Sequence, residues 1–254
     1  MAQEKIRLDD LLIERGIAQD RTYAQSLILS GSVLVNDQVE TKSGFLFSRK
    51  VIIRIKEKIK NYVSRAAHKL LGALEKFPKY PIESQYCIDL GASTGGFTQV
   101  LLEKGALKVL AVDVGYGQLE ERVRQHQKVE ILDRFHFKNL EWKHISHQGN
   151  SISVTADLSF ISMEKVFIKL QELFEKNNQT EIQALLMVKP QFELSAEFLE
   201  KGIVKDKRES LKIITNLIRK ARNNYKAKFH GISKSNVLGT EGNQEYFIYL
   251  TWGI

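Results

Sequence analysis

The chain has little of what secreted and membrane proteins require. Its 254 residues include a single cysteine, Cys87, so a disulfide framework is excluded and a reducing, intracellular setting is expected. Cys87 lies inside an apolar run, which favours a buried structural thiol over a nucleophile. No uninterrupted apolar stretch is long enough to cross a bilayer, and the charged first residues have no apolar segment behind them. We therefore expect a cytoplasmic protein with neither a membrane segment nor a secretory signal.

The histidines also lack the companions that a metal site needs. Because no cysteine set accompanies His126, His136, His144 and His147, we expect surface residues there and predict no metal. Internal repeats and low-complexity segments are absent as well. With 43% hydrophobic residues, the chain can bury a substantial core, either as one large domain or as a large domain with a small one.

The charge balance favours a polyanionic partner. The chain carries 38 basic and 30 acidic residues, a net charge of +8. The excess is concentrated towards the C-terminus, because residues 201–228 hold ten lysines or arginines against two acids. A basic surface of this kind is typical of nucleic-acid binding, although a solvated helix face explains the same run without any partner.

A glycine-rich loop is the clearest ligand-binding pattern. The apolar run Tyr86–Leu90 breaks into Gly91-Ala92-Ser93-Thr94-Gly95-Gly96-Phe97-Thr98, and a second apolar run ends in Asp113. Glycines let a nucleotide-sized ligand approach the backbone, and an acid ending the next strand accepts hydrogen bonds from ribose hydroxyls. The spacing differs from the G-x-G-x-x-G of dinucleotide sites, and the acidic Asp89 disfavours a pyrophosphate. A cationic ligand such as S-adenosylmethionine is therefore predicted, with an ordinary tight strand-to-helix turn as the alternative.

Residues 1–60 are predicted to form a small α+β module. Apolar residues at helical spacing predict two helices, and β-branched runs at 33–39 and 50–55 predict a small sheet. The pattern R-L-D-x-L-L-x-x-x-G, followed by S-G-x-V-x-V-N, runs from Arg7 to Asn36. It is similar to the RNA-binding domain named after the fourth small-subunit ribosomal protein. The resemblance implies that basic side chains contact the RNA backbone and dock the protein without reading sequence. The candidates by position are Arg7, Arg15, Arg21 and Lys42.

Residues 61–254 alternate between strand and helix patterns, which predicts an open α/β sheet with helices on both faces. Seven strands are expected, at 86–90, 109–114, 129–133, 153–158, 184–190, 228–233 and 246–252. Two helical stripes are the clearest, one at Met163, Val166, Phe167, Leu170 and Phe174 and the other at Leu211, Ile214, Leu217, Ile218 and Ala221. Because no helix separates the last two strands, they are expected to form an antiparallel hairpin. Five strands with helical crossovers and a terminal hairpin resemble the Rossmann-like fold of methyltransferases that use S-adenosylmethionine more closely than they resemble a dinucleotide-binding sheet.

Charged residues fall where such a sheet binds its ligands. Asp157 follows the run 153–156, and Lys189 follows the run 184–188 immediately before a proline. Ligands of open α/β sheets bind beyond the carboxyl ends of the strands. The last strand is antiparallel, so Glu245 at its start lies at the same edge. Each charge taken alone is explained equally well as the point where the chain reaches water.

Several long motifs, in order along the chain, resemble the haemolysin A type of ribosomal RNA methyltransferase. The segments that carry the resemblance are Tyr62–Leu70, Asp89–Thr98, Asp113–Leu119, Asp157–Ser162 and Lys189–Glu193, together with the N-terminal module. That family is related to the FtsJ-type ribose methyltransferases, which use a lysine-aspartate-lysine-glutamate tetrad. The matching positions here are Lys69, Asp157, Lys189 and Glu245. The resemblance implies transfer of a methyl group from S-adenosylmethionine to the 2′-hydroxyl of a cytidine in ribosomal RNA.

The tetrad residues suit this chemistry. A ribose hydroxyl is a poor nucleophile, and a lysine can act as its base when the surroundings favour the neutral amine. We expect Lys189 to be that base, Asp157 to orient its amine, and Glu245 to hold Lys69 or the hydroxyl. The expected cofactor contacts are Asp89, Gly91, Ala92, Ser93, Thr94, Gly95, Gly96, Phe97, Asp113 and Val114. Arg65, in the first of the matching motifs, joins the candidate RNA contacts.

Two other classes of protein fit parts of the pattern. A ribosome-assembly factor could keep the fold for binding RNA without catalysis, and a membrane-active haemolysin could use the basic helix around 208–222. Only an enzyme needs all four tetrad residues and tight cofactor binding, and only a haemolysin would release dye from liposomes. The expected partner is ribosomal RNA or a ribosomal subunit. The target nucleotide and the oligomeric state, a monomer included, stay open.

Overall fold

The computed structural model describes residues 5–29, 31–55, 62–146, 149–239 and 241–253. The chain divides into two units, Met1–Asn61 and Tyr62–Ile254, each with its own hydrophobic core. The sequence places the boundary after residue 60, which lies outside the described residues.

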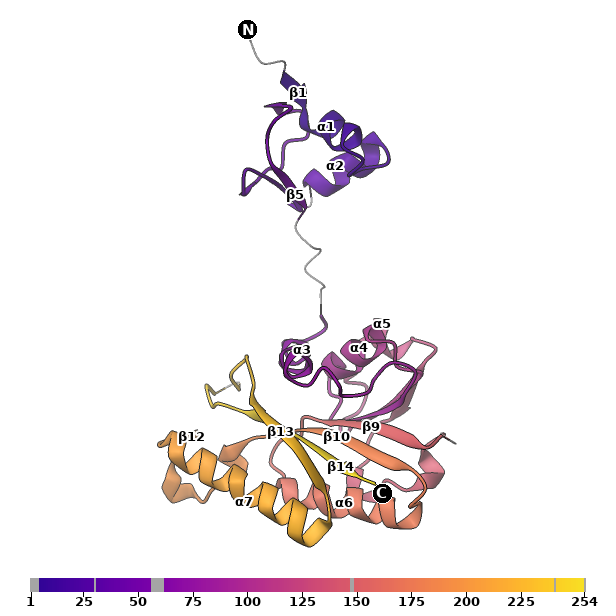
Figure 1. Cartoon of the computed structure of the whole chain (residues 1–254), viewed down its shortest axis with the longest axis vertical. Coiled ribbons are helices and arrows are strands. Elements are labelled where there is room, and N and C mark those ends of the chain that lie inside the picture. Colours follow the sequence, from indigo (N-terminus) through magenta and orange to yellow (C-terminus); the bar gives the residue numbers. More distant parts are fainter. Residues whose placement is uncertain (1–4, 30, 56–61, 147–148, 240, 254) are drawn as a thin grey trace. The chain divides into compact units, whose positions relative to one another are not determined.

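The first unit contains two helices and short strands (Figure 1). Its elements are β1 (Lys5–Arg7), α1 (Leu8–Glu14), α2 (Arg21–Leu29), β2 (Val33–Val35), β3 (Gln38–Val39), β4 (Leu46–Ser48) and β5 (Ile53–Ile55). Asn36 and Asp37 both have positive φ, as a tight hairpin turn between β2 and β3 requires. The helices and the sheet were predicted from the apolar spacing. The antiparallel β1–β4 pair was not, because strands of three residues are too short to show an alternating pattern.

The second unit is the larger one. Its helices and strands are α3 (Ala66–Lys76), β6 (Tyr86–Leu90), α4 (Gly96–Glu103), β7 (Lys108–Val112), α5 (Glu121–Arg124), β8 (Val129–Leu132), η1 (Phe137–Asn139), η2 (Trp142–His144), β9 (Ser151–Ala156), α6 (Met163–Lys176), β10 (Glu181–Val188), η3 (Pro190–Phe192), η4 (Ala196–Phe198), β11 (Leu199–Glu200), β12 (Ile203–Val204), α7 (Lys207–Tyr225), β13 (Lys228–Lys234) and β14 (Tyr246–Trp252).

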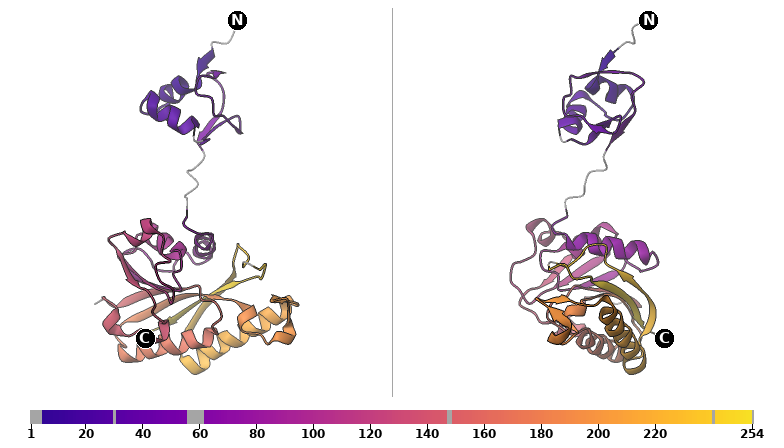
Figure 2. Two further views of the ribbon diagram at one scale, coloured as in Figure 1. Left: turned by 180° about the vertical axis from the view of Figure 1, so that it is seen from behind. Right: turned by 90° about the vertical axis from the view of Figure 1, so that its left-hand side faces the viewer.

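A seven-stranded sheet in the order β13-β14-β10-β9-β6-β7-β8 forms the centre of this unit. The strands from β10 to β8 are parallel, and β14 is antiparallel to both of its neighbours. Helices α3, α4 and α5 cover one face and α6 and α7 the other (Figures 1 and 2). The buried run of β10 supplies both layers, with Leu185 and Met187 on the first face and Leu186 and Val188 on the second. The predicted fold class is confirmed, terminal hairpin included.

Two details differ from the expected pattern. The connection from β8 to β9 contains the 3₁₀ turns η1 and η2 in place of an α-helix. On α7, Leu211 is 49% exposed, because the buried stripe runs through Ser210, Ile214, Leu217 and Ala221 and leaves Leu211 about 100° further round the helix.

None of the helices in the described residues has the length and apolar character needed to span a bilayer. Within those same residues, histidine, cysteine and carboxylate groups form no cluster of three or more that could hold a metal ion. His147 lies outside the described residues. Cys87 is buried, and burial raises the pKa of its thiol to about 12, so the thiol stays protonated at neutral pH.

Candidate active site

The sheet brings the predicted site residues to one edge. Gly91 follows β6, Asp157 follows β9 and Lys189 follows β10, all at the carboxyl ends of parallel strands. Val188 pairs with Tyr246, so Glu245, immediately before β14, arrives at this edge from the opposite chain direction. Ligands of open α/β sheets bind at this edge.

The glycine loop is held against the neighbouring strand. The backbone amides of Gly91 and Ala92 both donate to the carbonyl of Val112, at 2.9 and 3.2 Å. Gly91 has φ +81°, and a Cβ placed on it would lie 2.7 Å from the backbone oxygen of Asp157. Only glycine fits here without strain, because both the backbone angle and the space exclude a side chain.

Two adjoining cavities lie beside this loop. A cavity of about 270 Å³ is lined by Gly91, Ser93, Val112, Asp113, Val114, Phe135, Phe137, Asp157, Leu158, Ser159, Phe160 and Ile161. A second, of about 240 Å³, is lined by Ser64, Arg65, Ala66, Lys69, Gly91, Ala92, Ser93, Thr94, Phe97, Asp157, Ser159 and Lys189. The first is mostly apolar and the second contains charged and hydroxyl groups. Together they suit a ligand with a planar apolar part and a charged tail.

Asp113 lies in the wall of the first cavity. Its carboxylate accepts hydrogen bonds from the backbone amides of Ser93, at 2.8 Å, and Gly115, at 2.7 Å. These bonds fix the side chain, and a carboxylate has further lone pairs for two hydroxyl donors. The ribose contact expected of Asp113 from the sequence stays a prediction.

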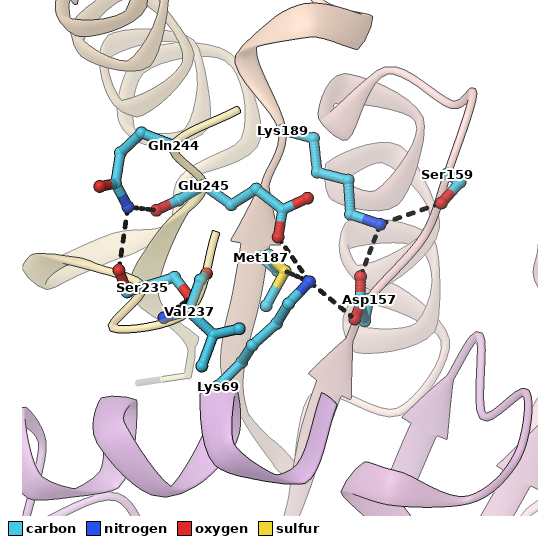
Figure 3. A network of polar contacts seen from close by, with 9 residues as sticks. All are labelled: Lys69, Asp157, Ser159, Met187, Lys189, Ser235, Val237, Gln244 and Glu245. Atoms are coloured by element: carbon cyan, nitrogen blue, oxygen red, sulfur yellow. Dashed lines mark hydrogen bonds and ion pairs between the residues drawn. The ribbon is translucent and has the colours of Figure 1, made fainter. Parts of the chain in front are cut away.

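The four charged residues form one continuous network (Figure 3). Lys69 Nζ lies 2.6 Å from Glu245 Oε2 and 3.9 Å from Asp157 Oδ2. Lys189 Nζ lies 2.6 Å from Asp157 Oδ1 and donates to Ser159 Oγ at 2.9 Å. Two ammonium groups thus meet two carboxylates, which lets charges with side-chain exposures of 3–15% remain buried together.

The surrounding residues fix Glu245 in place. The Gln244 side-chain amide donates to the backbone oxygens of Ser235, at 2.9 Å, and Glu245, at 2.8 Å (Figure 3). A Cβ on Gly239 would lie 2.8 Å from Glu245 Oε1, so this glycine leaves the carboxylate room. Lys69 is also close to Met187 Sδ, at 3.9 Å. The apolar flank and the fixed carboxylate leave the Lys69 ammonium little freedom.

A third cavity opens beside the network. It measures about 230 Å³ and is lined by Lys69, Ser159, Phe160, Lys189, Gln191, Phe192, Glu241 and Glu245. Phe160 is 86% exposed, has φ +60°, and its ring centroid lies 4.6 Å from that of Phe192. An exposed aromatic ring held by an unusual backbone angle beside charged groups is typical of a ligand contact. No role was predicted for either ring from the sequence.

Asp89 is in a different place from the one expected. Its side chain is fully buried beneath the glycine loop, where it accepts hydrogen bonds from Thr98 Oγ1, at 2.7 Å, and Thr155 Oγ1, at 3.4 Å. It lines none of the three cavities, and the ligand contact expected from its carboxylate stays a prediction. Burial is the main reason why the pKa of Asp89 is raised to about 7. The nearby charge of Asp157 also raises this pKa, whereas hydrogen bonds from Thr98 lower it.

This raised pKa predicts a pH-dependent stability. The buried Asp89 favours its protonated form, so its contribution to folding is fully present below about pH 4 and is lost as the pH rises to about 7. Asp89→Asn keeps a neutral, hydrogen-bonding side chain. We expect the free energy of unfolding of the wild type, relative to this variant, to fall by about 4 kcal/mol between these limits and to level above pH 7.5. Urea unfolding of both proteins across this range measures the difference, and parallel pH profiles would contradict the prediction.

Gly95 and Gly96, which are also predicted to contact the cofactor, line none of the three cavities. Gly95 has φ +93° at the start of α4, and a Cβ on Gly96 would lie 2.3 Å from Ser64 Oγ. The lack of a side chain at these two positions permits tight packing of the loop. Phe135 and Phe137, by contrast, line the first cavity although no role was predicted for them. The available signal was a pair of aromatic residues following the third strand of the sheet.

The candidate RNA contacts of the first unit are grouped around α1. Arg7 donates two hydrogen bonds to Asp9, at 3.0 and 2.7 Å, and Arg21 pairs with the adjacent Asp10. Lys42 is exposed in the loop whose backbone pairs with the start of α1. Arg15 lies at the other end of the helix, where it donates to a backbone oxygen. In the second unit, Arg65 is exposed and lines the second cavity.

Comparison with known proteins agrees with this arrangement. Residues 62–252 match the model of the FtsJ-like methyltransferases. The chain is 35% identical to the 16S/23S rRNA (cytidine-2′-O)-methyltransferase TlyA of Mycobacterium tuberculosis, over 97% of this chain and 90% of that protein. It is also 35% identical to Hemolysin A of Brachyspira hyodysenteriae, over 96% of this chain and 99% of that protein. A solved structure from Streptococcus thermophilus, provisionally named as a hemolysin, superimposes on this chain with a TM-score of 0.69 at 30% identity. The superposition covers 99% of this chain and 90% of that chain. This chain belongs to the FtsJ-like methyltransferase family.

Proposed function

We propose that this protein transfers a methyl group from S-adenosylmethionine to the ribose 2′-hydroxyl of a cytidine in ribosomal RNA. The observation that carries the proposal is that the space for the cofactor and the cavity beside the charged network adjoin each other at one sheet edge. Asp157 and Ser159 line both cofactor-sized cavities, and the Lys69–Asp157–Lys189–Glu245 network connects these cavities with the third one. The TlyA relatives, which are named as cytidine-2′-O-methyltransferases of rRNA, support the choice of substrate.

The first two cavities fit the cofactor. Val114, Phe135 and Phe137 supply apolar surface for an adenine, and the Asp113 carboxylate supplies acceptors for ribose hydroxyls. The hydroxyl groups and the Arg65 side chain of the second cavity suit the carboxylate of an amino-acid tail, and Asp157 suits its ammonium group. S-adenosylmethionine, when bound, supplies an electrophilic methyl group on its sulfonium.

Lys189 is the proposed general base. Its amine is oriented by the Asp157 carboxylate and by Ser159 Oγ, and it lines both the second and the third cavities. In its neutral form the amine takes the proton from the 2′-hydroxyl, while the hydroxyl oxygen forms its new bond to the methyl carbon. The sulfur–methyl bond would break at the same time, and its electron pair would remain on the sulfur of the cofactor. The products are a 2′-O-methylated nucleotide, S-adenosylhomocysteine and a protonated Lys189.

Lys69, Asp157 and Glu245 are proposed to position the reacting groups. The Lys69–Glu245 pair is buried and hydrogen-bonded on one wall of the third cavity, so a ribose entering there meets a fixed cation and a fixed carboxylate. Fixed neighbours restrict the hydroxyl to an approach in line with the methyl group, and such alignment supplies a large part of the acceleration in transfer reactions.

The first unit is proposed to dock ribosomal RNA. Arg7, Arg21 and Lys42 lie on or next to one end of α1, and their charges suit backbone phosphates rather than base edges. Arg7 and Arg21 are already paired with aspartates, so phosphates would compete for them or add to these pairs. Arg15 and Arg65 are further candidate contacts. We place this activity in the cytoplasm, with a ribosomal subunit as the partner.

Mapping ribose methylation tests the proposal directly. We expect cells that lack this protein to lose at least one 2′-O-methylcytidine from 16S or 23S rRNA, and a plasmid copy of the wild-type gene to restore it. Quantitative sequencing of 2′-O-methylated positions measures both results and identifies the target. An unchanged methylation map, combined with failure of the purified protein to label ribosomal subunits, would contradict the proposed function.

A further inference from the structure

Gln191 has a polar atom that no function so far uses. It lies two residues after Lys189 in the turn η3, between the proposed base and the aromatic ring of Phe192. Its Oε1 atom is buried and has no hydrogen-bond partner among the described residues, although the side chain lines the third cavity. A buried acceptor without a donor is unfavourable in a folded protein, and because Gln191 also lines a cavity, a ligand bound there can supply the donor.

The backbone around Gln191 is fixed. Pro190 opens the turn, and the amide of Phe192 donates to the carbonyl of Lys189 at 2.9 Å. In the loop that follows β9, Phe160 places the centroid of its exposed ring 4.6 Å from that of Phe192. The cavity therefore presents aromatic surface, on which a nucleobase stacks, next to an amide group that can contact the edge of that base.

The polar groups around this cavity favour hydrogen-bond donors on the base. Outside the charged network, the described polar lining residues besides Gln191 are Ser159, whose hydroxyl oxygen already accepts a hydrogen bond from Lys189, and Glu241, whose carboxylate is an acceptor only. The lysine ammoniums at the cavity are already directed at carboxylates, with Lys69 at 2.6 Å from Glu245 and Lys189 at 2.6 Å from Asp157. Cytosine carries an exocyclic amino donor at the position where uracil carries a carbonyl acceptor.

We propose that Gln191 is a specificity-determining residue that accepts a hydrogen bond from the exocyclic amino group of the target cytosine. The assignment rests on the proposed ribose methylation. The base stacks on the Phe160–Phe192 pair, and the Gln191 Oε1 atom distinguishes the amino group of cytosine from the carbonyl oxygen of uracil. The ribose of the same nucleotide then lies towards Lys189, because Gln191 and Lys189 line one cavity.

The test compares two versions of the mapped ribosomal RNA target, one with cytidine and one with uridine at the methylated position. Full-length wild type, Gln191→Ala, Gln191→Glu and the control Gln171→Ala are assayed with labelled S-adenosylmethionine. Gln171 lies on α6 and also has a buried Oε1 that finds no hydrogen-bond partner in the described part of the chain, but it lines none of the cavities described. The dissociation constant of the cofactor, measured for each variant, reports whether the first two cavities are intact.

We expect the wild type to favour cytidine over uridine in kcat/KM by at least tenfold, and Gln191→Ala to reduce this preference roughly tenfold through slower reaction with cytidine. Gln191→Glu, which keeps an acceptor and removes the amide donor, should retain the preference, and Gln171→Ala should match the wild type. Equal losses on both targets in Gln191→Ala, or a wild type without preference, would overturn the assignment while leaving ribose methylation established. A wild type that methylates neither target would overturn the proposed function as well.

Discussion

Replacing Lys189 with alanine is expected to lower kcat for ribose methylation by roughly 100-fold to 10,000-fold, the range over which general bases contribute. The variant removes the only amine that bridges Asp157 Oδ1 and Ser159 Oγ among the described residues, so nothing remains in place to take the proton of the hydroxyl. Single-turnover transfer of a labelled methyl group to ribosomal subunits measures the effect. The dissociation constants of the cofactor and of the RNA should stay within about threefold, because neither site depends mainly on this amine.

A second substitution separates a base from a simple positive charge. Arginine at position 189 keeps the charge beside Asp157 but cannot act as a base near neutral pH, so Lys189→Arg should be as inactive as the alanine variant. Lys176→Ala, at the exposed end of α6, is the matched control and should react at the wild-type rate. If Lys189→Arg retained more than a tenth of the activity, Lys189 would be a charge stabiliser rather than the base.

The sequence alone could locate most of the charged network, for a simple physical reason. Asp157 and Lys189 each follow a buried apolar run directly, and parallel strands bring their carboxyl ends together. Glu245 followed from the antiparallel direction of the last strand. Lys69 did not follow from any pattern, because a lysine with 8% side-chain exposure and an exposed lysine look alike in a helical stripe. Its position depended on the family resemblance.

Side-chain direction and tertiary packing explain what the sequence could not give. Asp89 lies one residue before the end of β6, and the pleat of the strand alone does not show that its carboxylate is bonded to Thr98 and Thr155 beneath the loop. The roles of Phe160 and Gln191 depend on residues from two different loops meeting at one cavity. The connection between β8 and β9 has no helical period, so the two aromatic residues that follow β8 were the only sign in the sequence of the aromatic wall that it supplies.

Replacing Gly91 with alanine is expected to weaken cofactor binding by about 100-fold or more. The new Cβ would lie 2.7 Å from the backbone oxygen of Asp157 and 3.0 Å from Leu158 Cδ2, in a residue with φ +81°. A backbone oxygen cannot move aside as a flexible side chain can, so the glycine loop and the Asp157 loop must separate. Displacements of about 1 Å in a preorganised site cost on the order of 100-fold in reaction rate, and we expect a loss of cofactor affinity of the same order. Isothermal titration with S-adenosylmethionine measures the loss of binding.

Gly16→Ala is the matched control for this substitution, because it separates backbone strain from the steric clash. Gly16 also has positive φ, at +68°, but no atom lies within 4 Å of the position of its Cβ, and it belongs to the first unit. The control should therefore lose about 1 kcal/mol of stability from the strained φ alone and bind the cofactor as the wild type does. Gly91→Ala should lose stability and binding together, with methyl transfer falling in parallel, because the clash moves Asp157 and, through the 2.6 Å contact, the Lys189 amine. Normal cofactor affinity in Gly91→Ala would show that the two loops separate without disturbing the cavities, and would remove the glycine loop from the binding site.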